Sequence, residues 1–116
     1  MSDIETLNRD EWLSRLKFDE KGLIPAIIQD EADQAILMLG YMNKESILKT
    51  LKEGKVTFWS RSRQTYWTKG ETSGNFLHLV SLYADCDGDA LLVVTHPKGP
   101  TCHTNKRSCF SWALAE

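Results

Sequence analysis

The feature that most constrains this sequence is a short acidic turn, D-C-D-G-D at residues 85–89, placed between two apolar runs. Residues 77–84 and 90–96 are rich in aliphatic and β-branched side chains, which favours two strands. Asp87-Gly88 is a dipeptide typical of tight hairpin turns. We therefore expect a hairpin here, with a cluster of carboxylates at its tip.

The amino-terminal part of the chain predicts a short helix followed by a second hairpin. Asn8 is a good helix cap, and Glu11 follows three residues later, as in a capping box. Residues 23–29 look like a strand, and Pro25 favours an edge position or an irregular strand. A polar turn separates this strand from a second one at residues 35–39.

The middle of the chain predicts a helix, a strand and a long loop. Asn43 caps a helix over residues 44–53, which carries an apolar stripe, and Gly54 ends it. Residues 55–60 are β-branched and aromatic, as in a strand. The polar residues 61–75 are expected to form a loop, and a loop of this length in a compact domain is usually functional or disordered.

These elements predict an α+β domain, with one mostly antiparallel sheet of about five strands and two or three short helices. A chain of 116 residues is long enough for one core and too short for two, so residues 1–116 are expected to form a single domain.

All three cysteines of the protein, Cys86, Cys102 and Cys109, lie within a stretch of 25 residues that opens with the acidic turn. Thiolates are soft ligands that suit zinc. Three protein ligands with a fourth position left for water is the arrangement of a catalytic zinc site. The alternative is three buried cysteines that act as small apolar residues. The polar surroundings of all three favour the zinc site.

His103 follows Cys102 directly, and three interpretations stay open for it. The imidazole would transfer protons beside the zinc ion, which we prefer because adjacent residues seldom both reach one metal without strain. It would otherwise be a fourth ligand of a structural zinc site, or an ordinary surface residue. His78 and His96 are interpreted as ordinary core or surface histidines.

Asp85, Asp87 and Asp89 alternate along the chain, so in extended backbone their carboxylates share one face. Clustered carboxylates suit a hard ion such as Mg²⁺, which would hold substrate phosphates. The plain alternative is an acidic hairpin turn. A calcium-binding EF-hand is excluded, because Ala90 and His96 stand where that loop needs Gly and Glu.

Basic and hydroxyl side chains surround the same region and suit a phosphorylated substrate, since Arg and Lys both bind phosphate. The candidates for phosphate or ribose contacts are Arg61, Arg63, Lys69, Thr72, Ser73, Lys98, Lys106 and Arg107, together with Gly74, Thr101 and Thr104.

The formal net charge of −2 argues against a general nucleic-acid-binding protein, which would be basic. The amino terminus has neither the basic segment nor the apolar run of a signal peptide, and no stretch approaches membrane-spanning length. We therefore expect a cytoplasmic protein that acts on a small molecule, with no membrane or nucleic-acid partner.

Five blocks of the sequence together resemble the phosphoribosyl-AMP cyclohydrolase family, whose members catalyse the third step of histidine biosynthesis. They are G-L-I-P-A-I-I-Q-D, L-M-L-G-Y-M-N, T-F-W-S-R-S-R-Q-T-Y-W-T-K-G-E-T-S-G-N, Y-A-D-C-D-G-D and K-G-P-T-C-H-T-N-K-R-S-C-F, and they span residues 22–110 almost without gaps. The family often has Gly where this chain has Asn105. Some relatives carry a fused pyrophosphohydrolase domain, and this chain resembles the single-function form.

The resemblance implies that Cys86, Cys102 and Cys109 bind Zn²⁺, with the zinc sites shared between the subunits of a homodimer. It implies that Asp85, Asp87 and Asp89 bind Mg²⁺. The expected reaction is hydrolysis of the N1–C6 bond of the adenine ring of 1-(5-phosphoribosyl)-AMP. Zinc would supply the nucleophile by lowering the pKa of water to about 7. The signature of nucleobase deaminases is absent.

Two other classes of protein explain part of the sequence. A zinc-stabilised nucleic-acid-binding module accounts for the cysteines and for the Arg and Trp residues of the long loop, but not for the three aspartates. A structural zinc or interaction domain accounts for the cysteines alone. Consumption of phosphoribosyl-AMP separates both from the enzyme.

Overall fold

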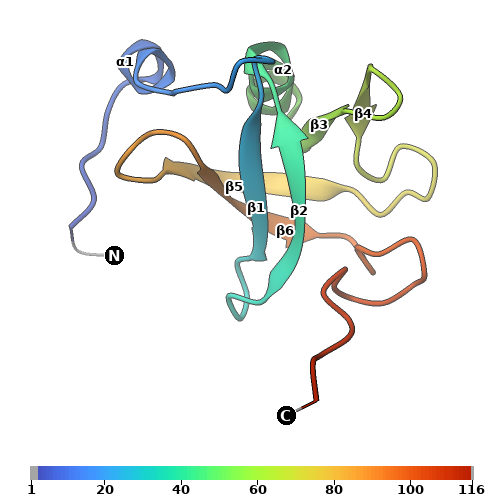
Figure 1. Cartoon of the computed structure of the whole chain (residues 1–116). Coiled ribbons are helices and arrows are strands. Elements are labelled where there is room, and N and C mark those ends of the chain that lie inside the picture. The colour runs from blue at the N-terminus through green and yellow to red at the C-terminus, as the bar shows by residue number, and fades with distance from the viewer. Residues whose placement is uncertain (1–2, 116) are drawn as a thin grey trace.

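The computed structural model describes residues 3–115, so residues 1, 2 and 116 of the predicted domain lie outside the description. Along the described residues, two helices and six strands confirm the α+β class. The elements are α1 Arg9–Ser14, β1 Ile24–Asp30, β2 Ile36–Met42, α2 Lys44–Glu53, β3 Thr57–Ser60, β4 Thr65–Thr68, β5 Leu77–Ala84 and β6 Leu91–Pro97. Both helices lie on the same side of the strands (Figure 1).

The main sheet has four strands in the order β2-β1-β6-β5, and β3 and β4 form a separate pair. β1 pairs antiparallel with β2, and β5 pairs antiparallel with β6, but β1 and β6 are parallel. The expectation of one mostly antiparallel sheet of about five strands therefore matches only roughly. The parallel pair joins segments from opposite ends of the chain, where no local sequence signal specifies a partner.

Pro25 predicts an edge strand or an irregular one. β1 is an interior strand, so the edge position is wrong, but its pairing with β2 has an irregularity between Ile28 and Gln29. Proline lacks a backbone N–H and so cannot donate a hydrogen bond to a neighbouring strand. The pairing of β1 with β6 begins only at Ala26, which faces Leu91. Pro25 stands one residue before that pairing, so the parallel ladder does not need its missing donor.

The region expected to be one long loop contains β4, which pairs antiparallel with β3. Two aromatic cross-strand pairs support this small sheet. Phe58 faces Trp67 with ring centres 5.6 Å apart, and Trp59 faces Tyr66 at 5.0 Å. Such pairs stabilise neighbouring strands. The many polar residues around β4 conceal its strand pattern in the sequence.

Helix α2 has the predicted bounds, and both of its ends are capped as the sequence indicates. The Asn43 side chain accepts a hydrogen bond from the Ser46 N–H at 2.8 Å, and Ser46 Oγ accepts one from the Asn43 N–H at 2.9 Å. Gly54 ends the helix with a φ of 73°. Glycine adopts this left-handed conformation without the strain that a side chain adds.

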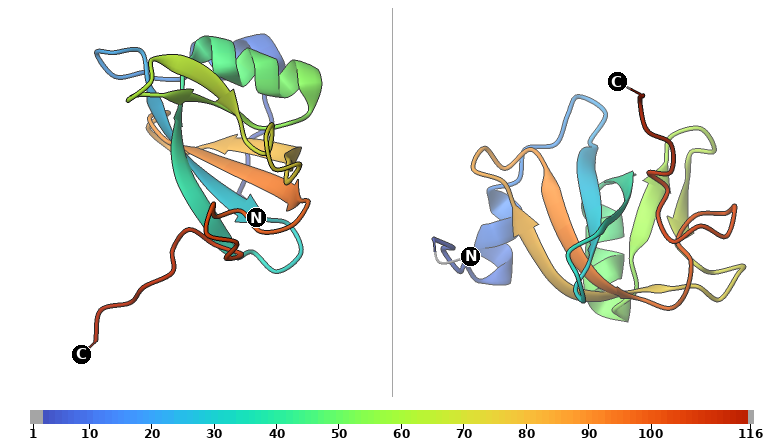
Figure 2. Two further views of the ribbon diagram at one scale, coloured as in Figure 1. Left: turned by 90° about the vertical axis from the view of Figure 1, so that its right-hand side faces the viewer. Right: turned by 90° about the horizontal axis from the view of Figure 1, so that it is seen from below.

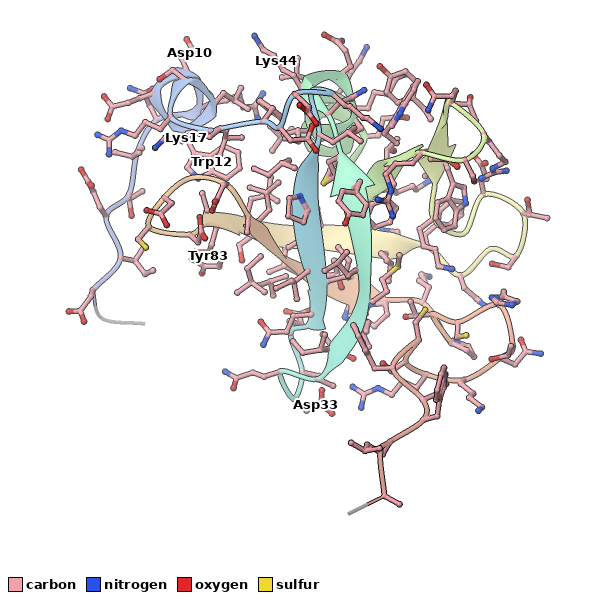
Figure 3. The ribbon with its side chains drawn as sticks, viewed as in Figure 1. Asp10, Trp12, Lys17, Asp33, Lys44 and Tyr83 are labelled. Carbon is pink, nitrogen blue, oxygen red and sulfur yellow. The ribbon has the colours of Figure 1, made fainter. Side chains whose placement is uncertain are left out.

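The core lies between the main sheet and a layer made by α1, α2 and β3 (Figure 2). Ile47 of α2 and Phe58 of β3 are buried against Ile24, Ile28 and Val93 of the sheet. Trp12 reaches from α1 toward the same core (Figure 3). Burying one such large apolar side chain contributes about 1.5–3 kcal/mol to stability.

The opposite face of the main sheet is apolar but exposed. Ile27 of β1 pairs with Leu39 of β2, and the two residues are 36% and 45% exposed. Leu92 of β6 stands beside Ile27 in the parallel ladder and is half-buried. The described part of the chain therefore leaves one side of its central sheet open. None of the described helices is long and apolar enough to span a membrane.

Candidate functional site

The aspartate turn, residues 85–89, connects β5 to β6 as the sequence predicts. Carboxylate oxygens of Asp85, Asp87 and Asp89 lie within 4.8 Å of one another. The turn is fixed to the segment that follows α1, because the N–H of Lys17 donates to the Gly88 carbonyl at 2.7 Å. A Cβ at Gly88 would lie 2.5 Å from the carbonyl oxygen of Arg15, so glycine is needed at this position.

The carboxylates of the turn influence each other's protonation. The Asp85 side chain raises the pKa of Asp89, through a hydrogen bond and through charge repulsion. Burial raises the pKa of Asp85, but hydrogen bonds from the backbone N–H and the side chain of Asp89 outweigh that effect and lower it. Such a cluster is stabilised by a cation, and carboxylate oxygens are the ligands that Mg²⁺ prefers.

The closing loop, residues 98–109, follows β6 and doubles back on itself. The N–H of Cys102 donates to the Lys106 carbonyl at 3.0 Å, and the N–H of Asn105 donates to the Cys102 carbonyl at 2.9 Å. The N–H of Cys109 donates to the carbonyl of Leu37 in β2 at 2.7 Å. These bonds place Cys102 and Cys109 near the beginning of β2.

Cys102 and Cys109 are near enough for each thiol to shift the pKa of the other. Hydrogen bonds from Thr104, whose Oγ1 is 3.0 Å from Cys102 Sγ, lower the pKa of the Cys102 thiol. Burial and the neighbouring Cys102 raise the pKa of Cys109, while the positive charge of Lys69 favours both thiolates. A thiol pair beside a cation is a suitable part of a soft metal site.

Cys86 does not join this thiol pair within one chain. The aspartate turn precedes β6 and the closing loop follows it, so the seven residues of β6, about 20 Å of extended chain, separate them. The two segments lie at opposite sides of the sheet in two perpendicular views (Figures 1 and 2). Among residues 3–115, the aspartates form the one group of three potential metal ligands that lie close together.

Asn105 has a φ of 66°, a left-handed conformation that Asn tolerates better than most residues with a side chain. Asn105 therefore occupies the backbone conformation that suits Gly, the residue that we expect at this position in related sequences. The loop keeps its turn, and His103, next to Cys102, is exposed.

Arg107 binds two aspartates of the β1–β2 hairpin. Its Nη2 donates to Asp30 Oδ2 at 2.9 Å and to Asp33 Oδ1 at 2.7 Å. Asp30 is buried, whereas Asp33 lies at the tip of the hairpin (Figure 3). The guanidinium thus anchors the closing loop to the sheet, and its charge is already balanced by carboxylates.

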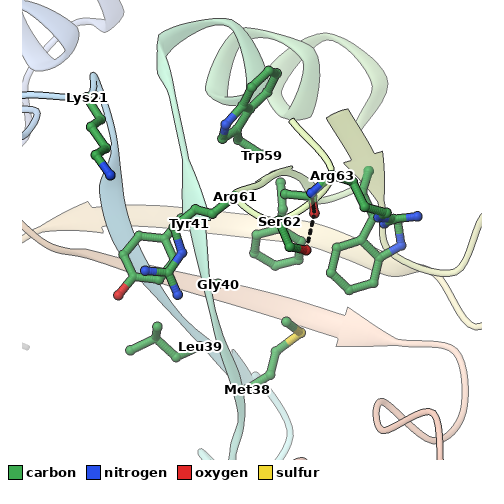
Figure 4. A pocket seen from close by; sticks show the side chains of 12 residues that line it. Lys21, Met38, Leu39, Gly40, Tyr41, Trp59, Arg61, Ser62 and Arg63 are labelled. Carbon is green, nitrogen blue, oxygen red and sulfur yellow. Dashed lines mark hydrogen bonds between the residues drawn. The ribbon is translucent and has the colours of Figure 1, made fainter. Parts of the chain in front are cut away.

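A pocket of about 650 Å³ opens between β2 and the β3–β4 sheet (Figure 4). Its lining combines cations, aromatic rings and serine hydroxyls, and it contains no carboxylate. The lining residues are Lys21, Met38, Leu39, Gly40, Tyr41, Phe58, Trp59, Ser60, Arg61, Ser62, Arg63 and Trp67. A hollow of this size and charge suits an anionic ligand with an aromatic part.

Two of the predicted phosphate-binding residues, Arg61 and Arg63, lie in this pocket. The Arg61 guanidinium stacks on the Tyr41 ring, 3.8 Å from its centre. The predicted residue Lys69 lies 5.2 Å from the ring centre of Trp67, which lines the pocket, and its charge reaches both thiols of the closing loop. Lys69 therefore connects the aromatic wall of the pocket with the thiol pair.

The other predicted phosphate-binding residues lie elsewhere. Thr72 and Ser73 are exposed in the turn after β4, and Lys98 and Lys106 are exposed in the closing loop.

His78 and His96, which the sequence suggests are ordinary core or surface residues, face each other across β5 and β6. Nδ1 of the exposed His96 lies 3.0 Å from Glu31 Oε2, whereas Nε2 of His78 is buried and has no hydrogen-bond partner among residues 3–115.

The sequence did not point to the other lining residues, among them the lysine and aromatic residues Lys21, Tyr41, Trp59 and Trp67. Lys21, Trp59 and Arg61 also line an adjoining hollow of about 260 Å³, together with Asn43 and Gln64. The alternating aromatic residues of β3 and β4 were a usable signal for the two tryptophans, because they indicate a small sheet rather than a loop. Lys21 has no such signal.

A cationic, aromatic pocket beside two thiols on a small α+β fold suits an enzyme that acts on an anionic aromatic ligand. The sequence model of the phosphoribosyl-AMP cyclohydrolase family matches residues 38–111. Phosphoribosyl-AMP cyclohydrolase of Cereibacter sphaeroides is 54% identical over 101 residues, 87% of this chain and 85% of that protein. That of Ruegeria pomeroyi is 53% identical over 103 residues, 89% of this chain and 87% of that protein.

A longer relative matches as well. The histidine biosynthesis bifunctional protein HisIE of Staphylococcus epidermidis is 59% identical over 91 residues, which are 78% of this chain and 43% of that protein. The chain belongs to the phosphoribosyl-AMP cyclohydrolase family, a family of hydrolases.

Proposed function

We propose that this chain hydrolyses 1-(5-phosphoribosyl)-AMP in histidine biosynthesis, as a cytoplasmic homodimer that uses Zn²⁺ and Mg²⁺. The supporting observation is the cationic, aromatic pocket beside Cys102 and Cys109, in a chain that belongs to this family. Membership of a hydrolase family favours this function over the two non-enzymatic interpretations of the cysteines.

The pocket has the parts that this substrate requires. A purine carrying two phosphoribosyl groups is flat in the middle and doubly phosphorylated at its ends. Trp67 and Tyr41 supply rings on which a base can stack, and Arg61 and Lys21 supply positive charge. Lys21 and Arg61 are shared with the adjoining hollow, so one phosphate would bind there and the other nearer to Lys69.

The donor set fits zinc if two chains contribute to each site. Cys102 and Cys109 already form a close pair, and a tetrahedral catalytic zinc takes one more protein ligand at about 2.3 Å. Cys86 of the same chain lies at the opposite end of β6 and cannot be that ligand. Cys86 of the partner subunit supplies the third thiolate when two copies pack in opposite directions.

The open face of the main sheet supports such a homodimer. Ile27 and Leu39 expose apolar surface on the side opposite the core, next to Leu92. Covering this face removes apolar surface from water, which favours association. Leu39 also lines the pocket, so a partner on this face would close one of its walls.

The aspartate turn fits magnesium, because its three carboxylates converge and repel one another without a cation. Zinc would acidify a water molecule for attack, and magnesium would bind substrate phosphates. In the proposed dimer, the aspartate turn of one subunit, which includes Cys86, lies beside Cys102 and Cys109 of the other subunit.

The chain's own residues then orient the substrate and move protons. The water oxygen bonds to C6, the N1–C6 bond breaks, and N1 takes a proton, leaving a carboxamide at the former C6. His103, adjacent to Cys102, would take the proton from the water and return it to N1. The residues of the pocket would hold the base so that C6 faces the thiol pair.

Co-expression of two inactive variants tests the shared site. Cys86→Ala and Cys109→Ala should each lose tightly bound zinc and the consumption of phosphoribosyl-AMP. In a mixed dimer one of the two sites has all three thiolates, so the co-expressed pair should recover about a quarter of the activity. The pair Cys102→Ala and Cys109→Ala is the matched control and should recover none, because the remaining thiolates never complete a site. Equal recovery in both pairs would contradict the shared site.

A further inference from the structure

The carboxy-terminal segment, residues 110–115, leaves the body of the protein at Cys109, which is hydrogen-bonded to β2. It is neither helix nor strand, and it extends away from the sheet (Figures 1 and 2). Phe110, Trp112 and Leu114 are 65%, 95% and 94% exposed. Three large apolar side chains thus stand in water within five residues.

These apolar residues alternate with the small residues Ser111 and Ala113. A repeat of two residues is the pattern of a strand with one apolar face. Within residues 3–115, no backbone hydrogen bond to another backbone group involves residues 110–115. The segment therefore has the side-chain pattern of a strand but lacks a strand to pair with.

A strand with one unpaired side, β5, lies at the other edge of the main sheet. The outer side of β5 is covered near its beginning, where the N–H of Leu79 donates to the Gly54 carbonyl at 2.9 Å. Beyond that point, no described residue bonds to the outer side of residues 80–84, and Val80 is 49% exposed. A free edge of this kind is a template for strand addition.

The segment cannot easily reach this edge within its own chain. β2 and β5 are opposite edges of a four-stranded sheet, about 14 Å apart at the usual strand spacing. Residues 80–84 also end beside the aspartate turn, which lies at the far end of β6 from Cys109. To reach this edge, the six residues of the segment would have to cross the width of the sheet and the length of β6, yet they extend away from the sheet.

A second copy of the chain can bring the carboxy-terminal segment and the free edge of β5 together. We infer that residues 110–115 of one subunit add to the free edge of β5 of the partner subunit as an antiparallel strand. This inference rests on the shared zinc site proposed above, in which Cys109 lies beside Cys86 of the partner subunit. Residue 110 then starts two residues from the end of the partner's β5, and the segment runs back along residues 84 to 80.

Hydrogen exchange of the zinc-loaded dimer tests this pairing. Full-length protein is compared with a variant lacking residues 111–116, both at concentrations where sedimentation shows dimers. The backbone amides of residues 80–84 that point away from β6 should exchange at least about tenfold faster in the shortened protein, because only they lose their strand partner. The amides of residues 91–95 in β6 are the internal control and should not change.

A second measurement uses point variants of the same segment. Trp112→Ala should raise the dimer dissociation constant about tenfold or more, because a large buried aromatic ring is lost from the interface. Ala113→Ser, on the other face of the segment, should leave it unchanged. Equal exchange at residues 80–84 in the full-length and shortened dimers overturns the strand addition while leaving the shared site intact. A full-length protein that is monomeric with zinc bound overturns both.

Discussion

The guanidinium carbon of Arg61 lies 3.8 Å from the centre of the Tyr41 ring. The arginine belongs to the turn between β3 and β4, whereas the tyrosine belongs to β2, so the contact joins the two sheets across the pocket. Arg61 is exposed and pairs with no carboxylate within residues 3–115. Its charge is held in place by an aromatic ring and remains available to an anion.

Arg61→Ala should therefore weaken substrate binding. The variant loses a fixed positive charge that binds phosphate, so we expect kcat/KM to fall about 10- to 100-fold, mainly through KM. Steady-state kinetics with phosphoribosyl-AMP measures this effect. Arg107→Ala is the matched control, because Arg107 is already neutralised by Asp30 and Asp33 and should affect stability more than KM. A larger KM effect for Arg107 would exchange the roles of the two arginines.

Asp87→Asn should remove the response to magnesium while keeping zinc. Ionised carboxylates in the aspartate turn repel one another, and a divalent cation relieves that repulsion. The pKa of Asp89 is raised in the folded protein, so stability is lost as the pH rises through this pKa and Asp89 ionises. Mg²⁺ bound to the carboxylates would offset this loss, so added Mg²⁺ should raise the melting temperature of the wild type at pH 7. The variant should show a smaller rise, with unchanged zinc content by metal analysis. Loss of zinc together with magnesium would show that the aspartates maintain the fold.

His103→Ala should lower kcat by about 10²- to 10⁴-fold with zinc still bound, because a positioned proton-transfer group typically contributes that much. His103 is exposed in the closing loop beside Cys102, so its removal should not disturb the core. Zinc content distinguishes the alternatives, since a fourth ligand would loosen the metal. Turnover within a few-fold of wild type would make His103 an ordinary surface residue.

Asp33→Asn should destabilise the protein at neutral pH but not in acid. A hydrogen bond from Arg107 lowers the pKa of Asp33 below its ordinary value. A carboxylate with a lowered pKa in the folded state contributes stability above its unfolded pKa, and that contribution is lost as pH falls through the folded pKa. Urea denaturation should give a lower midpoint for the variant at pH 7, and the difference should shrink as the pH falls below about 4, the ordinary pKa of an aspartate. A difference that stays constant as the pH falls would exclude the ionic contribution.

Much of the local structure could be predicted from the sequence. The limits of α2 follow from Asn43, which caps its first turn, and from Gly54, which takes the left-handed conformation that ends it. The β5–β6 hairpin follows from its alternating apolar runs and from the Asp87-Gly88 turn. The convergence of the three aspartates follows from their spacing. These features depend on residues a few positions apart, whose conformational preferences are short-range.

The pairing of distant segments could be decided only by the tertiary structure. The parallel contact between β1 and β6 forms because both strands bury one face in the same core. Pro25 is tolerated in an interior strand because the pairing of β1 with β6 starts at the next residue, Ala26. Arg107 meets Asp30 and Asp33 across 77 and 74 positions of the chain. No local pattern determines such a partner.

The three cysteines illustrate the same difference between local sequence information and tertiary placement. The residue types, the family blocks and the short spacing between Cys102 and Cys109 can be read directly from the sequence. Only the tertiary structure placed Cys86 at the opposite end of a rigid seven-residue strand from the other two. Residues that are close along the chain are far apart in space when a strand separates them, because a strand is a nearly fully extended backbone.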